Sequence, residues 1–207
     1  MAIGTRSARA EATRRRIVDA ARPLFVELGY RDTTMSALAR AAGVAVQTLY
    51  LSFGSKAAVL EAALAADAED HPSGGTGLAD GDGPTALLRH VEVTAVEVAR
   101  RHPLDAVLRG AAGEPDPAEL LARARRAALA GHARAVDELA ERPGFTGHMS
   151  LQRVTESMAA LLSPETFGLL VVAHGWTVQD WAEWAGRHLV ADLFPTGLSG
   201  SPGTLDP

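Results

Sequence analysis

The chain has 207 residues, 47% of them hydrophobic, with a formal net charge of −5 and no cysteine. This hydrophobic content excludes disorder over most of the chain, and the lack of cysteine excludes disulfides, thiolate zinc sites and cysteine nucleophiles. No apolar run approaches the roughly 18 residues needed to span a bilayer, so we expect a soluble protein without a membrane partner.

The charge is divided unevenly along the chain. From Met1 to Ala58, nine basic and four acidic residues give +5, so the remainder carries −10. A basic head on an acidic body is the asymmetry expected when only the head meets a polyanion. The arginine-rich N-terminus is not followed by an apolar segment, so we do not expect a secretory signal.

The first 70 residues predict four helices, because runs with helical spacing of apolar residues are separated by glycines and by hydroxyl residues suited to capping. These helices are expected at Ile17–Leu28, Thr34–Ala42, Val46–Phe53 and Lys56–Glu69. Gly29 is expected to end the first helix, and Pro23 to bend it by removing a hydrogen bond.

The segment from His71 to Pro84 is rich in glycine and proline and predicts a linker. Its glycines fit neither the dinucleotide-binding nor the P-loop pattern, and its aspartates would repel phosphate. Helical patterns then follow at Thr85–Arg101, Leu104–Gly110, Pro117–Glu141, Ser150–Leu162, Pro164–His174 and Thr177–Phe194, before a flexible tail. The helix from Pro164 is apolar on nearly every side, so it needs cover from its own domain and from a partner chain.

Two short helices joined around Gly43 and Val44, packed on a basic first helix, predict a helix-turn-helix. The third helix would then enter the major groove, where its first side chains meet base edges. The segment GYRDTTMSALARAAGVAVQTLYLSFGSKAAVL resembles the TetR family of transcriptional repressors, which shows GY, TT, AGV, TLY, F and SK at these spacings. The resemblance extends from about Ile17 to Leu60, a quarter of the chain.

The resemblance implies an all-α fold with an N-terminal three-helix DNA-binding domain and a larger C-terminal helical domain for ligand binding and dimerisation. We therefore divide the chain into a DNA-binding domain with a basic arm (1–58), an effector-binding and dimerisation domain (59–194) and a flexible tail (195–207). A cytoplasmic homodimer is expected, with a double-stranded DNA operator and an unknown small-molecule effector as its partners. No cofactor is expected.

Several residues are predicted to contact DNA. The Thr34 hydroxyl and nearby helix-end amides can bind phosphate, and the Gln47 amide can make a bidentate contact to adenine. The resemblance implies that Thr48 and Tyr50 touch phosphate and sugar and that Lys56 clamps a phosphate. The full predicted set is Arg14, Arg15, Thr34, Ser36, Ala45, Val46, Gln47, Thr48, Tyr50 and Lys56.

Some positions depart from the family pattern. Ala45 replaces a frequent serine, Gln47 a frequent glycine, and Leu51 and Ser52 replace basic or histidine residues. Leu51 and Ser52 reduce the expected number of charged phosphate contacts, and we expect the arginine arm Arg6–Arg16 to compensate. Two alternatives remain open: Arg14 to Arg16 as an ordinary solvated helix face, and Tyr50 as a packing residue.

The C-terminal half offers candidates for dimerisation and effector binding. The predicted dimer interface consists of Phe167, Val171, His174, Trp181, Ala185 and His188. Core packing within one chain is the alternative for the tryptophans. The predicted effector site draws on His90, His132, His148 and Trp176, with His102 as a further candidate. Scattered histidines are also common as surface or satisfied core residues, and without close HxxxH spacing or cysteine we expect no metal site.

Two other functional classes compete with DNA-dependent regulation. An enzyme is not expected, because the sequence has no GxSxG, no HExxH and no nucleotide-binding loop. A helical protein-interaction module that has lost sequence-specific DNA binding is the stronger alternative, because Leu51 and Ser52 weaken the charged contacts. Salt dependence separates these cases, and activation instead of repression also stays open.

Overall fold

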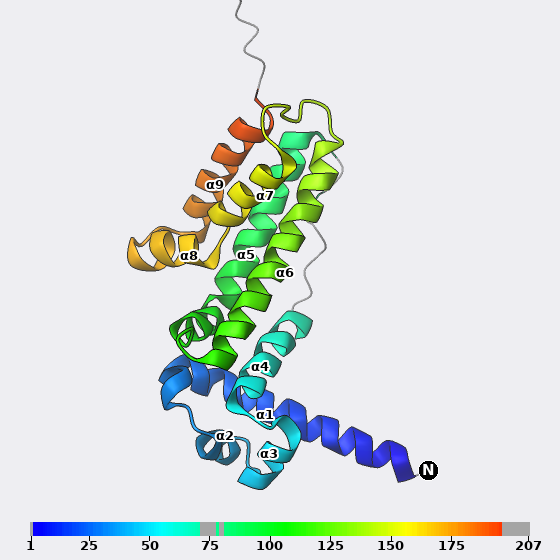
Figure 1. Ribbon diagram of the computed structural model, residues 1–207, viewed down its shortest axis with the longest axis vertical. Coiled ribbons are helices and arrows are strands. Elements are labelled where there is room, and N and C mark those ends of the chain that lie inside the picture. The colour runs from blue at the N-terminus through cyan, green and yellow to red at the C-terminus, as the bar shows by residue number, and fades with distance from the viewer. Residues whose placement is uncertain (1, 71–77, 79–80, 196–207) are drawn as a thin grey trace, which may run out of the picture. The chain divides into compact units, whose positions relative to one another are not determined.

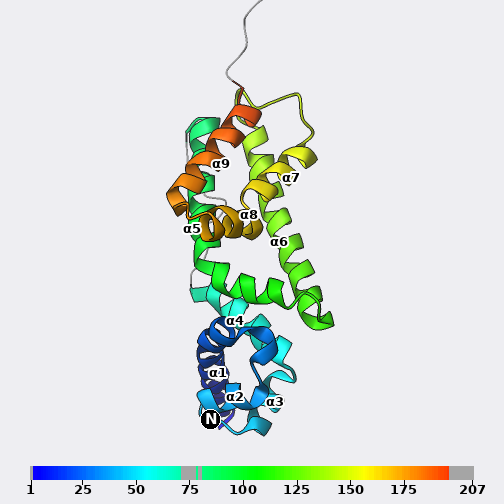
Figure 2. The ribbon, with the colours of Figure 1, turned by 90° about the vertical axis from the view of Figure 1, so that its left-hand side faces the viewer.

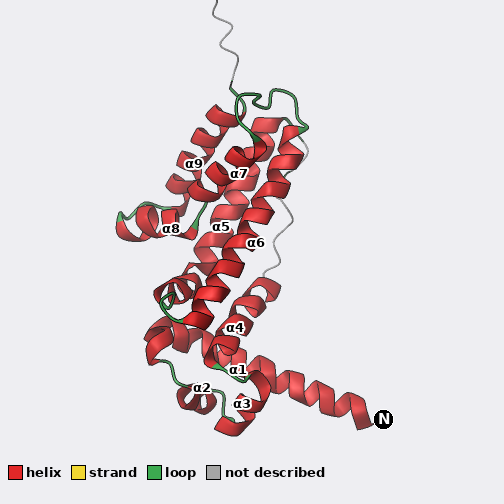
Figure 3. Ribbon diagram, viewed as in Figure 1, coloured by secondary structure: helices red, strands yellow, loops and turns green. Residues whose placement is uncertain are grey.

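The computed structural model describes residues 2–70, 78 and 81–195, and of residues 2–7 it describes only the backbone. Every regular element in these ranges is a helix, which confirms the predicted all-α class (Figure 3). Most of the predicted linker and the tail beyond Pro195 lie outside the described residues, as does the side chain of Arg6 in the predicted arm.

The helices follow one another in the order labelled in Figure 1. Their bounds are α1 Ala2–Asp32, α2 Met35–Ala41, α3 Val46–Phe53, α4 Lys56–Asp70, α5 Gly83–Gly110, α6 Pro115–Ala140, α7 Leu151–Leu161, α8 Pro164–Phe167, the π-helix η1 Gly168–Ala173, and α9 Val178–Leu193. Hydroxyl side chains accept hydrogen bonds from first-turn amides at Thr34, Ser150, Ser163 and Thr177, and Thr177 forms a capping box with Asp180. These caps confirm the predicted starts of α2, α7, α8 and α9.

Three elements differ from the predicted ones. Helix α1 begins at Ala2 instead of Ile17, and its backbone leaves the helical region at Gly29, with φ 74° and ψ 175°, where the helix was expected to end. Helix α5 passes through Pro103, because Leu104 and Leu108 are buried just beyond it and their packing outweighs the lost hydrogen bond. The predicted helix from Pro164 is a short α-helix followed by the π-helix η1.

The chain forms two compact units that are not continuous in sequence. Unit 1 comprises residues 1–73 and 100–127, and unit 2 comprises residues 74–99 and 128–207. Helices α5 and α6 therefore contribute residues to both units. This division by packing differs from the division at residue 58, which was drawn from the extent of the helix-turn-helix motif.

The core of unit 1 joins the first four helices to the ends of α5 and α6. Ile17, Phe25, Leu38 and Leu49 are fully buried in it, together with Leu60. Leu104, Leu108 and Leu120 complete the same cluster. Helix α1 packs against both α2 and α4, and α2 packs against α3, so α1 is the element on which the helix-turn-helix rests (Figure 1).

The core of unit 2 is built around Trp181 of α9. Its ring packs edge to face on Phe167 at 5.3 Å, and its indole N–H donates to the Leu161 carbonyl at 3.1 Å. Helix α9 lies beside α7 (Figures 1 and 2). Trp181 and Ala185 are fully buried, and Phe167 is 5% exposed. These three residues, which were predicted at a dimer interface, fill the core of their own chain.

One segment passes a length and hydropathy test for membrane spanning. Leu151–Ala173 has a mean hydropathy of 1.2, and α3 with α4 would pass only if the 69° bend between them were counted inside one span. The first segment is two helices, since α7 ends at Leu161 and Ser163 caps α8. Val154 and Met158 are fully buried in unit 2, so we interpret this segment as part of a protein core.

The start of α5 is sensitive to added volume, because a Cβ on Gly83 would lie 2.1 Å from Cε1 of Phe194. We predict that Gly83→Ala lowers the free energy of unfolding of unit 2 by about 1–3 kcal/mol, as overpacking does. Gly131→Ala is the control, because its Cβ would lie 3.9 Å from Arg134, and it should leave stability unchanged or raise it by up to about 1 kcal/mol. Urea denaturation followed by tryptophan fluorescence tests this, and equal midpoints for both variants would contradict it.

Candidate nucleic-acid interface

Helices α2 and α3 meet at a tight turn stabilised by the backbone. Gly43 adopts a φ of 63°, which favours glycine, and the Val44 amide donates to the Ala39 carbonyl at 3.0 Å. Leu38 of α2 and Leu49 of α3 are fully buried on the inner side. The two helices therefore have a fixed relation, as a helix-turn-helix requires.

The outer face of α3 carries four exposed side chains, those of Val46, Gln47, Tyr50 and Leu51. They stand at positions i, i+1, i+4 and i+5, so they form one continuous strip on the helix. Tyr50 is 51% exposed, which is contrary to the alternative that it is a packing residue. The sequence analysis treated Leu51 only as the replacement of a basic or histidine residue. Its spacing of four residues from Gln47 also places it on this strip.

The N-terminal ends of α2 and α3 differ. The Thr34 hydroxyl accepts the Ala37 amide at 3.1 Å and keeps its own hydrogen for a second acceptor, while Ser36 is exposed beside it. At α3 the cap residue is Ala45, which offers no side-chain hydrogen bond. The first amides of α3 are therefore left for an external acceptor such as phosphate.

Arg14 fixes the opposite end of α3. Its guanidinium donates to the Ser52 carbonyl at 2.8 Å and lies 4.1 Å from the centre of the Phe53 ring. A cation at a helix C-terminus is favoured by the helix dipole and by the carbonyls that lack partners there. Arg14 was predicted to contact DNA, and in the structure it supports the helix that carries the exposed strip.

Arg15 has an internal partner as well. Its guanidinium pairs with Asp70 of α4 at 2.5 Å, and Arg22 pairs with the same carboxylate at 3.1 Å. Arg15, which was predicted to contact DNA, thus forms an ion pair between α1 and α4. Residues 15 and 70 are 55 positions apart, so no local spacing could have indicated the pair.

Lys56 lies against the break in α1. Its ammonium donates to the Tyr30 carbonyl at 2.5 Å and to the Arg31 carbonyl at 3.3 Å, and it lies 4.1 Å from the centre of the Tyr30 ring. Partial burial lowers the pKa of Lys56, although the carboxylates of Glu114 and Asp32 oppose this shift. Lys56, which was predicted to clamp a phosphate, thus joins the start of α4 to the end of α1. Its ammonium keeps one further N–H that can donate a hydrogen bond.

Tyr30, the tyrosine of the GY pair noted in the sequence, lies against this lysine. Burial raises the pKa of the Tyr30 hydroxyl, and the negative charges of Glu114 and Asp116 raise it further. Its ring stacks on that of Phe25 at 6.2 Å. Both aromatic rings belong to the core of unit 1, so the break at Gly29 turns the chain into the core instead of away from it.

Among the predicted effector residues, the structure brings two together in unit 2. The rings of His90 on α5 and His132 on α6 are both buried and lie edge to face at 5.8 Å. Burial, and to a lesser degree His90, lowers the pKa of His132 to about 4. His132 is therefore neutral at pH 7, and its buried Nδ1 has no hydrogen-bond partner among the described residues.

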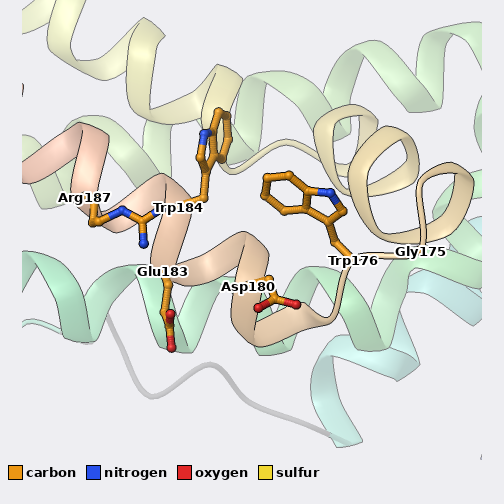
Figure 4. Close-up of a pocket in the computed structure, with 6 residues that line it drawn as sticks. All are labelled: Gly175, Trp176, Asp180, Glu183, Trp184 and Arg187. Atoms are coloured by element: carbon orange, nitrogen blue, oxygen red, sulfur yellow. The ribbon is translucent and has the colours of Figure 1, made fainter.

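The other candidates lie elsewhere. His148 is exposed between α6 and α7, and His102 belongs to unit 1, where burial and the charge of Arg109 lower its pKa. Trp176 meets Trp184 edge to face at 6.2 Å in an open pocket of about 380 Å³. In Figure 4 both indoles lie on one side of α9, and the Glu183 carboxylate points to the other. Within residues 2–70, 78 and 81–195, no group of three acidic or histidine side chains is placed to hold a metal.

The sequence of the helix-turn-helix matches a known family. Residues 17–63 match the model of the bacterial regulatory proteins of the tetR family. This segment of the chain is therefore similar to the DNA-binding segment of TetR-family regulators. A curated relative, the HTH-type transcriptional regulator SrpR of Pseudomonas putida, is 46% identical over 66 residues, which are 32% of this chain and 30% of SrpR. The chain therefore matches about a third of the length of this relative.

Solved structures of other proteins share the fold over most of the chain. A TetR-family transcriptional regulator from Rhodococcus sp. has a TM-score of 0.70 at 21% identity, covering 88% of this chain and 99% of that one. The complex of SmeT with triclosan has a TM-score of 0.69 at 20% identity, covering 95% of this chain and 98% of SmeT. At such identities the similarity shows the fold alone.

The internal contacts of Lys56 in unit 1 predict a loss of stability on mutation. Lys56→Met removes two charge-assisted hydrogen bonds and a cation–π contact, so we expect unit 1 to lose about 1–3 kcal/mol of unfolding free energy. Arg40→Met is the control, because Arg40 is exposed and its removal deletes the same charge; its effect should stay within about 0.5 kcal/mol. Urea denaturation followed by circular dichroism compares them. Equal stability of the two variants would refute the internal role.

The buried His132 predicts a pH-dependent stability of unit 2. Its pKa is lower in the folded chain, about 4, than the ordinary 6.5, so the unfolded chain binds a proton first as the pH falls. Stability is then full above about pH 6.5 and is lost toward pH 4, by about 2 kcal/mol between pH 7 and pH 5. His132→Leu should remove this part of the loss, and exposed His148→Leu should not. Tryptophan fluorescence in urea at both pH values tests it, and identical pH dependence of the three proteins would disprove it.

Proposed function

We propose that this chain is a homodimeric, DNA-binding transcriptional repressor that acts in the cytoplasm and is released from a palindromic operator by a small-molecule effector. The observation that carries the proposal is the exposed strip on α3, held on a helix-turn-helix that matches the TetR family. Two polar side chains, those of Gln47 and Tyr50, stand on this strip, and the amides at the start of α3 have no side-chain cap. This combination suits base edges flanked by phosphates.

Electrostatics also support a polyanionic partner. Residues 1–58 carry +5, although Arg14, Arg15 and Lys56 are engaged inside unit 1. Arg16 and Arg40 are exposed, and an arginine engaged through some of its five N–H groups keeps others for phosphate. We therefore assign phosphate binding to the exposed arginines and hydroxyls and regard Arg14 and Lys56 first as positioning residues.

The dimer is assigned to the last two helical segments of unit 2. Leu169 is 55% exposed and Val172 is 62% exposed on η1, and His174 follows them at the surface. His188 of α9 is exposed as well, and Val171 is half-buried. These side chains replace the buried Phe167, Trp181 and Ala185 in the proposed interface, because burying exposed apolar area is what drives association.

The effector is assigned to unit 2, where His90 and His132 are buried side by side, and SmeT, a protein of similar fold, forms a complex with triclosan. The buried imidazoles of His90 and His132 would supply polar contacts within an apolar core. A ligand can release DNA only if it binds more tightly to a conformation with lower DNA affinity. Helix α5 contributes residues to both units, so it is the element through which we propose that the ligand acts.

A helical interaction module is the second candidate. It is favoured by one observation, the 82% exposure of Leu51 on α3, because an apolar side chain there also suits a protein partner. Binding to DNA and binding to an apolar protein surface differ in their response to salt. Phosphate contacts release counterions and weaken as salt rises, whereas an apolar interface does not.

Selection of duplex DNA from a random pool by the full-length protein tests the proposal. We expect enrichment of a palindrome, with affinity falling about a hundredfold between 50 and 200 mM salt for roughly four phosphate contacts. A palindrome would support both operator binding and the dimer. If the folded protein enriches no site at either salt concentration, operator binding is wrong and the interaction module becomes the better assignment.

Variants of the strip on α3 then test its reading role. Gln47→Ala should change the base preference at one position of each half-site, because the bidentate amide is lost. Tyr50→Phe should weaken binding modestly and nearly equally across sequences, because it removes a contact assigned to phosphate. Repeating the selection with each variant measures both effects. An unchanged preference for Gln47→Ala would remove this residue from base readout.

A further inference from the structure

Leu51 stands out among the apolar side chains of the described residues. Its 82% exposure is the highest of any large hydrophobic side chain there, and the next is Val96 at 65%. Leu49 and Phe53, on either side of it in α3, both pack into the core of unit 1, and Leu51 does not join them. The chain thus places a fully accessible isobutyl group on the face of α3 opposite the core.

The surroundings of Leu51 indicate what covers it. Gln47 lies one helical turn before it on the same strip, and Tyr50 is its neighbour. Both carry polar groups at their tips, and the first turn of α3 lacks a side-chain cap. An apolar protein partner would have to bury these polar groups together with the leucine, which is unfavourable unless each is hydrogen-bonded. The positive charge of residues 1–58 further favours a polyanion.

The major groove of DNA offers one apolar group at its floor, the C5-methyl of thymine. We propose that Leu51 reads a thymine by packing against this methyl group, and that it thereby sets specificity at a position next to the one read by Gln47. The inference rests on the proposed DNA-binding function. One helical turn advances about 5.4 Å and one base step about 3.4 Å, so the thymine lies one or two steps from the adenine contacted by Gln47.

This assignment changes the interpretation of the departure at position 51. A basic residue there would bind phosphate and add affinity to every sequence equally. Leucine forms no hydrogen bond, so it contributes only where a methyl group meets it. The two side chains of the strip then read an A·T-rich step in complementary ways, Gln47 through hydrogen bonds to adenine and Leu51 through the thymine methyl.

Replacing thymine by deoxyuridine tests the proposal, because it removes the methyl group and keeps every hydrogen-bonding group of the base pair. The probe is the palindrome selected by the full-length protein, with each thymine replaced in turn in both half-sites. At one position per half-site we expect the affinity of the unmutated protein to fall about fourfold for each lost methyl contact. Fluorescence anisotropy with labelled duplexes measures the affinities.

Two variants complete the experiment. Leu51→Ala should bind thymine and deoxyuridine duplexes equally at that position while still responding to changes at the base read by Gln47. Leu28→Ala is the matched control, because Leu28 is also an exposed leucine of unit 1, 42% exposed. This variant should lose affinity about fourfold for each lost methyl contact, as the unmutated protein does. Circular dichroism confirms that both variants are folded.

The outcomes separate this inference from the function on which it rests. If the unmutated protein binds its palindrome but ignores every thymine methyl, Leu51 is not a methyl reader and DNA binding stands. If Leu51→Ala weakens binding yet stays as sensitive to the methyl as the unmutated protein, the leucine acts elsewhere and the inference is wrong. If no duplex is selected at all, both proposals fail, and Leu51 becomes the first candidate for a protein contact.

Discussion

Arg14 donates a hydrogen bond to the Ser52 carbonyl and stacks on Phe53, and this contact holds the C-terminal end of α3. A helix of eight residues is too short to be stable alone, so tertiary contacts must supply its order. Buried Leu49 fixes its inner side, and the turn at Gly43 fixes its start. With both ends and one side held, the remaining side of α3 can stay exposed without unfolding. The exposed strip of α3 therefore depends on the positive charge of Arg14, which is not part of the strip.

Several positively charged side chains of unit 1 form contacts within unit 1. Arg15 and Arg22 share Asp70, and Lys56 binds the carbonyls that the break at Gly29 leaves open. These contacts connect α1 to both ends of α4. Since the charges remain near the surface, a nearby phosphate would still experience their field, although with weaker direct contacts. We therefore expect the DNA-sequence specificity of unit 1 to depend more on the shape and polarity of α3 than on the number of its cations.

Local signals predicted most of the fold. Hydroxyl caps at Thr34 and Ser150 and glycines at 43 and 54 define helix ends, because they act within a single turn of the chain. The continuity of α5 through Pro103 and the burial of Trp181 depend on residues distant in sequence. The spacing of apolar residues within one helix cannot predict such contacts. The candidate nucleic-acid interface shows the same difference between local and long-range contacts. The exposed positions of α3 could be predicted from spacing, whereas the partners of Arg15 and Lys56 could not, since they lie 55 and 26 residues away.

The discontinuity of unit 1 limits how such a head can be exchanged between proteins. Its core contains Leu104 and Leu108 of α5 and Leu120 of α6. These three leucines follow the predicted linker in the sequence. A recombination event that joined residues 1–70 to a foreign body would leave that core without these three leucines unless the new body brought equivalents. The exposed side chains of α3 can change by single substitutions without disturbing the core. The head as a module must instead be inherited together with segments of α5 and α6, so its evolution is coupled to theirs.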